Sequence, residues 1–316
     1  MLKHLVRIIT VICLFTVAVA GAAFANDFPT RPVKIIVPFN AGGETDITAR
    51  LLAAEMEKIL GQNVVVQNIA GASGMTGCKA MLRAKNDGYV LGVIPSGPLA
   101  MHPHMRKIPY SYKDFTYIGR VINSPYLVYV NKTAPWNSMD EMIADMKANP
   151  NKFYWGSSGV GSVPFFALTD LFKAYDVKAR HVPFKGDTGA FQAMAGDRIH
   201  VYATTAGPLS KFDVKALSLL SAERSPLLKD LPPISEQGKD VHYSQWMVLV
   251  GPDNLPKNVQ DTISAAMEKA CNSPSFKEAL SRLSLAPAYI PSEATRTFVQ
   301  SEYERNGVNI KAAMSQ

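Results

Sequence analysis

The stretch VKIIVPFNAGGETD, residues 33–46, decides the fold. Its first part, Val33–Val37, is mostly β-branched and predicts a strand that is buried on both faces. A pair of glycines follows, and then a helical pattern begins, with Asp46 as the expected N-cap. The apolar stripe of this helix runs to Leu60, and Gly61 suits the C′ position that ends it. A strand, a glycine turn and an amphipathic helix in this order predict an α/β fold.

The alternation of apolar strands and amphipathic helices continues along the chain. Further strands are expected at 64–66, 89–94, 126–130, 153–156, 179–182, 199–203 and 245–250. Further helices are expected at 138–149, from Ser162, after Asp187, at 257–272, at 274–283 and from Ser292. Strand-helix-strand order with short turns predicts a parallel sheet covered by helices.

The N-terminus has the pattern of an export signal. Lys3 and Arg7 give a positive start, an apolar run covers 8–20, and Ala23-Phe24-Ala25 forms a cleavage site. The alternative is a membrane anchor, but the apolar run is shorter than the roughly 20 residues that span a bilayer. We therefore expect residues 1–25 to be a signal peptide cleaved before Asn26, and a periplasmic mature protein.

The size of the mature chain predicts two lobes. About 290 of the 316 residues remain after cleavage, which is more than one core comfortably serves. No low-complexity linker separates the halves, so we expect strands to cross directly between them, as in hinge-closing proteins. The crossings are placed near 124–126 and 243–246. Lobe 1 is then 26–125 plus 246–316, and lobe 2 is 126–245.

Charge and cysteine content exclude some classes of protein. The formal charge of +7 falls to +5 when Lys3 and Arg7 are removed, and the basic residues are scattered. A nucleic-acid partner is therefore not expected. The two cysteines of the mature chain, Cys78 and Cys271, could pair in an oxidising compartment or stand as separate buried thiols.

Two glycine-rich loops, each at the end of a predicted strand, suit an anion. The first is 38–46 and the second is 156–162. Glycines leave the backbone accessible, and the following helix presents unpaired N–H groups to a ligand. Each loop could instead be an ordinary strand-to-helix turn. One loop from each lobe, both at strand ends, favours a shared binding site.

Three other segments lie at strand ends, and we interpret them mainly as turns: 95–98, 183–187 and 204–208. Trp246 could line the site, but an aromatic residue in a strand is more often part of the core. No nucleophile elbow, Walker A loop or dinucleotide fingerprint is present. His102-Pro103-His104 is interpreted as a surface loop and not as a metal site. We expect no catalytic residue, no cofactor and no metal.

The chain resembles the substrate-binding proteins of tripartite tricarboxylate transporters, the Bug (Bordetella uptake gene) family. The resemblance covers nearly the whole mature chain. It is most specific at 28–39 and 41–46, and it continues through 154–161 and 182–186.

The resemblance implies a type II periplasmic-binding-protein fold with Venus-flytrap closure, each lobe having a central sheet flanked by helices. It implies a small carboxylate as ligand, docking onto one large and one small membrane subunit, and a monomer. Carried over by position, the ligand-binding residues would be Phe39, Ala41, Gly42, Gly43, Thr45 and Asp46 in the first lobe, Ser158, Gly159, Gly161 and Ser162 in the second, and Ser96, Phe184, Thr205 and Ala206 at the sides.

Two residues depart from the family pattern. Glu44 replaces a small or neutral residue. If it faces the ligand, it would repel a carboxylate or attract a ligand with an amino or ring-nitrogen group. Phe184 stands where tyrosine is common, which removes a hydroxyl donor. Two other functions stay open at this point: a periplasmic sensor that signals to a membrane histidine kinase, and a secreted enzyme of small acids.

Overall fold

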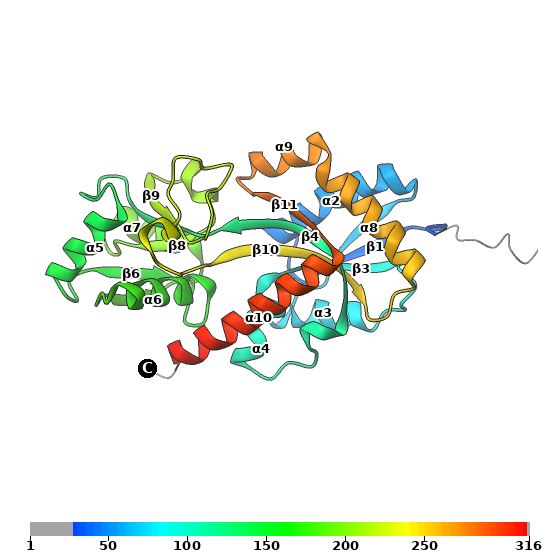
Figure 1. Ribbon diagram of the computed structural model, residues 1–316, viewed down its shortest axis with the longest axis horizontal. Coiled ribbons are helices and arrows are strands. Elements are labelled where there is room, and N and C mark those ends of the chain that lie inside the picture. The colour runs from blue at the N-terminus through cyan, green and yellow to red at the C-terminus, as the bar shows by residue number, and fades with distance from the viewer. Residues whose placement is uncertain (1–27, 315–316) are drawn as a thin grey trace, which may run out of the picture.

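The computed structural model describes residues 28–314. The predicted signal peptide and its cleavage site before Asn26 lie outside these residues. Figure 1 shows an elongated molecule in which one large sheet and two smaller sheets lie side by side, with β4 and β10 running between them. Within residues 28–314, no helix is long and apolar enough to cross a membrane.

The large sheet has six strands in the order β11-β4-β10-β3-β1-β2. These strands are β1 (Val33–Val37), β2 (Val64–Asn68), β3 (Val90–Pro95), β4 (Phe115–Pro125), β10 (Ser244–Pro252) and β11 (Pro287–Pro291). Strands β1, β2 and β3 run parallel to one another, but β10 pairs antiparallel with both β3 and β4, and β11 pairs antiparallel with β4. The prediction of a parallel sheet is thus wrong for half of this sheet, because β10 enters it from the opposite end.

Helices cover both faces of the large sheet. They are α2 (Glu44–Leu60), α3 (Met75–Leu82), α8 (Lys257–Asn272), α9 (Pro274–Arg282) and α10 (Ser292–Met314). Ile35 of β1 belongs to one core cluster with α2 and α8, whereas Ile36 belongs to another with Trp246 and α10. Neighbouring residues of a strand point to opposite faces, so β1 is buried on both, as predicted. Trp246 is fully buried, as expected for a core residue.

The smaller sheets lie on the other side of the molecule. One has the order β8-β5-β9, and the other pairs β6 with β7. Their strands are β5 (Leu127–Asn131), β6 (Tyr154–Ser157), β7 (Arg180–Pro183), β8 (Tyr202–Thr204) and β9 (Val214–Leu219), and their helices are α5 (Met139–Ala148), α6 (Val163–Tyr175) and α7 (Asp187–Ala195). Short helical segments complete the described chain: η1 (Ala72–Gly74), η2 (Gly97–Met101), α4 (His102–Met105), η3 (Tyr112–Asp114), η4 (Gly207–Ser210) and η5 (Ile234–Gln237).

Three backbone segments meet where the large sheet joins the smaller ones. Tyr126, the one residue between β4 and β5, donates its N–H to the carbonyl of Tyr243 at 2.8 Å. Its own carbonyl accepts from Leu220 at 2.7 Å, and Tyr243 donates to the carbonyl of Leu220 at 2.9 Å. We call these three residues the junction. It coincides with both predicted crossings, although the lobe boundaries themselves stay a prediction.

Helix α10 adds a further link between the two parts. Ile310, near its end, belongs to the same buried cluster as residues of α5 and α6. Asn309 donates its side-chain amide to the hydroxyl of Tyr243 at 3.3 Å. Figure 1 shows α10, in red, running from the large sheet toward the smaller ones. The end of α10 therefore packs against the part that was predicted to be lobe 2.

Several local predictions are corrected. Helix α2 begins at Glu44 with Gly43 as N-cap, so Asp46 is not the cap. The surface-loop interpretation of His102 and His104 is wrong, since both lie on α4 and His104 contacts the Tyr303 carbonyl at 2.8 Å. Cys78 and Cys271 are both free and buried. Of the two alternatives for these cysteines, the structure therefore shows the separate buried thiols and not the disulfide.

Close packing of α3 on the first loop generates a stability prediction. A Cβ at Gly77 would lie 2.6 Å from the Cα of Pro38 and 2.7 Å from the carbonyl oxygen of Ile69. Both obstacles are backbone, so Gly77→Ala should destabilise the fold by about 1–3 kcal/mol in urea unfolding. Gly196→Ala is the control, because its nearest atom would lie at 3.7 Å, and it should change stability by less than about 0.5 kcal/mol. Equal midpoints for the two variants would contradict this packing.

Candidate functional site

The first glycine-rich loop is held together by the carboxylate of Asp46. The Asp46 side chain is almost fully buried, and its Oδ2 accepts from the Gly42 N–H at 2.8 Å and from Arg50 Nε at 3.0 Å. Its Oδ1 accepts from Asn68 Nδ2 at 2.9 Å. Burial alone would raise its pKa, but the hydrogen bonds from Arg50, Gly42 and Asn68 hold the pKa of Asp46 below its usual value. Asp46, predicted as a ligand contact, thus positions the loop.

The first loop also holds unpaired amides at the start of α2. Gly43 caps α2 without a side-chain hydrogen bond, and Ile47 is the first residue to donate back, to the Gly43 carbonyl at 3.0 Å. The N–H groups of Glu44, Thr45 and Asp46 have no hydrogen-bond partner within residues 28–314. Unpaired amides at the positive end of a helix dipole form a site for an anion.

The second loop, between β6 and α6, has a partly capped helix. Ser162 is the N-cap, and its Oγ accepts from the Phe165 N–H at 3.4 Å and donates to the Gly159 carbonyl at 2.7 Å. Gly159 and Gly161 have φ values of 109° and 83°, which favour glycine. In the described chain, the amides of Ser158, Val160 and Gly161 have no partner. This loop also offers donors, but the Ser162 hydroxyl is already used.

Charged groups of the two parts of the molecule act on each other near the first loop. Burial, and then the negative charge of Asp187 at the start of α7, raise the pKa of Glu44 to about 7. Tyr202 donates its hydroxyl to Asp187 Oδ1 at 2.7 Å. Burial raises the pKa of Tyr126, and the charges of Asp187 and Glu44 raise it further. Glu44 of the first loop is thus within electrostatic range of Asp187, at the start of α7.

The second loop also contacts the large-sheet part directly. A Cβ at Gly161 would lie 2.3 Å from the Cε of Met105 on α4. No side chain larger than hydrogen fits at Gly161 unless Met105 moves.

The other predicted site residues lie around these loops. Phe39 packs near Gly74, where an added Cβ would lie 3.1 Å from its ring. Ser96 is buried and donates to Gln245 Oε1 at 3.2 Å. The Thr205 carbonyl accepts from the Tyr129 hydroxyl at 2.8 Å. The remaining predicted positions fall into two groups by exposure. The exposed ones are Ala41, Gly42 and Gly43, and the more buried ones are Thr45, Phe184 and Ala206.

Sequence reasoning missed four residues of this region: Tyr126, Asp187, Tyr202 and Thr204. Thr204 donates to Asp187 Oδ2 at 2.8 Å, so both oxygens of that carboxylate are held. Asp187 ends the predicted turn segment 183–187, which was a usable signal. The two tyrosines belong to the predicted apolar strands 126–130 and 199–203, where the sequence pattern marks them only as core.

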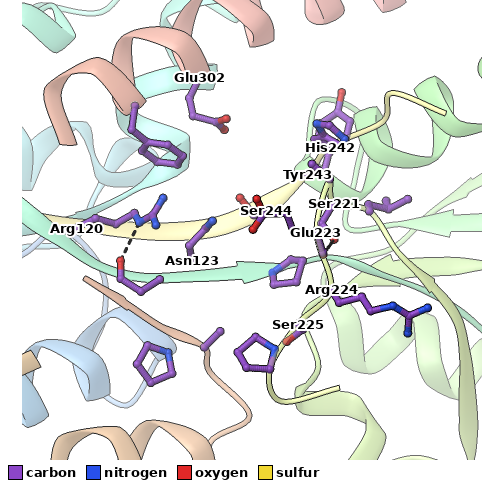
Figure 2. A pocket seen from close by; sticks show the side chains of 18 of the residues that line it. Arg120, Asn123, Ser221, Glu223, Arg224, Ser225, His242, Tyr243, Ser244 and Glu302 are labelled. Atoms are coloured by element: carbon purple, nitrogen blue, oxygen red, sulfur yellow. Dashed lines mark hydrogen bonds between the residues drawn. The ribbon is translucent and has the colours of Figure 1, made fainter. Parts of the chain in front are cut away.

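A separate pocket of about 350 Å³ lies behind the junction (Figure 2). It is lined by parts of β4, β11 and α10 and by 220–226 and 242–244, and by none of the predicted site residues. In the sheet order it lies on the β11 side, whereas the first loop follows β1. Two of its arginines already have partners: Arg120 donates to the Ala288 carbonyl at 2.9 Å, and Arg224 pairs with Glu236 at 2.6 Å. The loops, with their unpaired amides, are therefore the better candidate site.

In the described part of the chain, no group of three or more His, Cys, Asp or Glu side chains could hold a metal ion.

Comparisons with known proteins are consistent along the chain. The family model described as tripartite tricarboxylate transporter family receptor matches residues 48–314. Protein BugT of Bordetella pertussis is 30% identical over 313 residues, which cover 96% of each chain. A TctC solute-binding protein from Polaromonas has a TM-score of 0.82 at 28% identity, covering 90% of this chain and 99% of that one.

Two further solved structures are described with bound acids. Rpa4515 of R. palustris, with adipate, has a TM-score of 0.77 at 26% identity and covers 91% of this chain and 98% of its own. MatC of Rhodopseudomonas palustris, with malate, has a TM-score of 0.71 at 26% identity and covers 90% of this chain and 100% of its own.

The Asp46 network generates a pH-dependent prediction. Asp46→Asn should lower the free energy of unfolding at pH 7 by about 1–3 kcal/mol, because a buried charged acceptor is lost. Since the folded pKa lies below the unfolded value of about 3.9, this stabilisation is complete above that value and disappears as pH falls through the folded pKa. Urea midpoints of wild type and variant should therefore converge as the pH falls through the folded pKa of Asp46. Asp230→Asn, at an exposed position, is the control. A gap between wild type and Asp46→Asn that does not narrow at any pH below the unfolded value of about 3.9 would refute the role of the charge.

Proposed function

The chain belongs to the tripartite tricarboxylate transporter receptor family, and from that premise we propose that it captures a small organic acid between its two parts and delivers it to a transporter. The family is one of periplasmic solute-binding receptors and not of enzymes. Its relatives that are described with malate and adipate support a carboxylate as the class of ligand.

The observation that carries this proposal is the set of unpaired amides on the two loops. Micromolar binding needs about −8 kcal/mol, and one helix N-terminus supplies only about 0.3–2 kcal/mol. Hydrogen bonds to a charged group add roughly 1.5–3 kcal/mol each. Several donors must therefore converge on one acid. The amides of Glu44, Thr45 and Asp46 and those of Ser158, Val160 and Gly161 are such a set.

We assign the two parts as lobes that close on the ligand. Lobe 1 is 26–125 plus 246–316, lobe 2 is 126–245, and the hinge lies at the junction. Strands β4 and β10 supply two crossings there, which supports a hinge of fixed axis. The closed state binds the acid with more donors, so the ligand shifts the population toward it. The end of α10 packs against lobe 2. When the lobes close, this end of the helix must therefore either move together with lobe 2 or slide across its surface.

The remaining parts of the proposal concern location and partners. Residues 1–25 act as a signal peptide that is cleaved before Asn26, so the receptor works as a monomer in the periplasm. The closed form docks onto one large and one small membrane subunit. Binding of nucleic acid has no part in this function.

A thermal-shift screen tests the class of ligand. Dicarboxylates, tricarboxylates, aromatic acids and amino acids should include at least one compound that raises the melting temperature by several degrees. A ligand at 100 times its Kd stabilises the native state by about 2.7 kcal/mol. If no acid in the panel raises the melting temperature, the proposed function is wrong.

Gly43→Val tests the site. Gly43 has φ −80° and ψ 168°, which valine tolerates, and an added Cβ would meet only the Asn40 carbonyl at 3.7 Å. The branched side chain would shield the first-turn amides of α2. We expect titration calorimetry to show affinity lowered at least about tenfold, because one or more charged hydrogen bonds are lost.

Ala265→Val, on the exposed side of α8, adds two methyl groups away from the loops and should bind like wild type. Unchanged affinity in Gly43→Val would show that the amides of α2 do not contact the acid.

A further inference from the structure

The pocket behind the junction contains an arginine that has no acidic partner. Three arginines line this pocket: Arg120, Arg224 and Arg305. Arg224 pairs with Glu236, and Arg305 pairs with Glu302. Arg120 forms no ion pair in the part of the chain that the structure describes. One half-buried positive charge at this pocket is therefore left without a counter-charge.

Neighbouring groups fix the direction of the Arg120 guanidinium. Its Nε donates to the Ala288 carbonyl at 2.9 Å, and its central carbon lies 4.5 Å from the centre of the Phe298 ring. Its two terminal nitrogens have no hydrogen-bond partner within residues 28–314. Burial lowers the pKa of Arg120, and the charge of Glu302 offsets this only in part. A guanidinium held in this way presents a fork of N–H donors that matches a carboxylate.

Asn123 supplies a second unpaired group in the same wall. Asn123 and Arg120 both belong to β4, and both line the pocket (Figure 2). The Asn123 side chain forms no hydrogen bond in the described chain, and its Oδ1 is buried without a partner. Its Nδ2 carries two N–H groups, so it can donate to an anion that Arg120 holds.

The size and the remaining walls of the pocket limit what fits. Its volume of about 350 Å³ lies at the small end of the range for ligand pockets, which begins near 300 Å³. Apolar side chains form much of the wall, among them Pro125, Leu220, Ala286 and Pro287. A single unpaired cation suits a single carboxylate, and the apolar walls favour a ligand whose body is apolar.

We propose that the pocket behind the junction is a second binding site, for a monocarboxylate with an aromatic or similarly apolar body. Arg120 and Asn123 hold the carboxylate, and the apolar walls surround the body. The site is separate from the two glycine-rich loops, because none of its lining residues belongs to them. Its walls come from β4, β11 and α10 on one side and from 220–226 on the other, so its ligand contacts both parts of the molecule.

Matched small molecules test the site. An amide NMR titration of the full exported protein with benzoate should shift the N–H signals of Ser221, Arg224 and Ser225, which line the pocket. Benzamide has the shape of benzoate without its charge, and acetate has the charge without the ring. Both, and also inorganic phosphate, should bind at this site at least about tenfold more weakly than benzoate.

Variants then locate the carboxylate. Asn123→Asp keeps the shape of the side chain and gives Arg120 a negative neighbour, so it should weaken benzoate binding at least about tenfold. Arg120→Gln, which removes the fork of donors, should have the same effect. Asn63→Asp makes the same change of charge at an exposed position and should bind benzoate like wild type. Gly43→Val alters the first loop and should leave the pocket signals responsive. Melting temperatures near wild type would show that the variants fold.

Several results would overturn this assignment. Equal affinities for benzoate and benzamide, or full affinity in both Asn123→Asp and Arg120→Gln, would show that these side chains do not hold a carboxylate. If acetate or phosphate binds as tightly as benzoate, the apolar body contributes nothing and the proposed class of ligand is wrong. If benzoate shifts no signal of the pocket, the pocket is not a site for such acids. If benzoate then shifts only the two loops, the function proposed for the loops still stands.

Discussion

The open N-terminus of α2 is the constraint on which the rest of the site depends. A helix start needs acceptors for its first N–H groups, and most helices supply one from a capping side chain. Here Gly43 has no side chain to offer, and Asp46 uses its carboxylate to hold Gly42, Arg50 and Asn68. The loop is therefore rigid while its amides stay unpaired. A bound anion is the acceptor that such a helix start lacks.

Local patterns predicted the elements that local interactions form. Strand β1 and helix α8 were placed with the bounds that the structure gives, because each has an uninterrupted apolar pattern. Strand β4 was missed since Gly119, Arg120 and Asn123 interrupt its apolar residues, and its pairing partners β10 and β11 are more than 100 residues away. Asp46 was misread as an N-cap because residue type shows a preference for capping but not which amide the side chain reaches.

The candidate site was predicted in its backbone but not in its side chains. Glycines and strand ends are visible in a sequence, so both loops could be found. Which side chains of the smaller sheets surround the first loop depends on how those sheets are placed against the large one, and no spacing rule records that placement. Backbone amides recognise carboxylates in general, so the side chains around them must distinguish one acid from another. Specificity in this receptor thus depends on the residues that the sequence pattern left undefined.

The most direct test of the central claim is an amide NMR titration of the isotopically labelled protein with an acid that raises its melting temperature. The account predicts that the N–H signals of Thr45 and Asp46 and those of Val160 and Gly161 shift together, since both loops bind one ligand. Shifts confined to one loop, or to Arg224 and Ser225 in the pocket behind the junction, would contradict it.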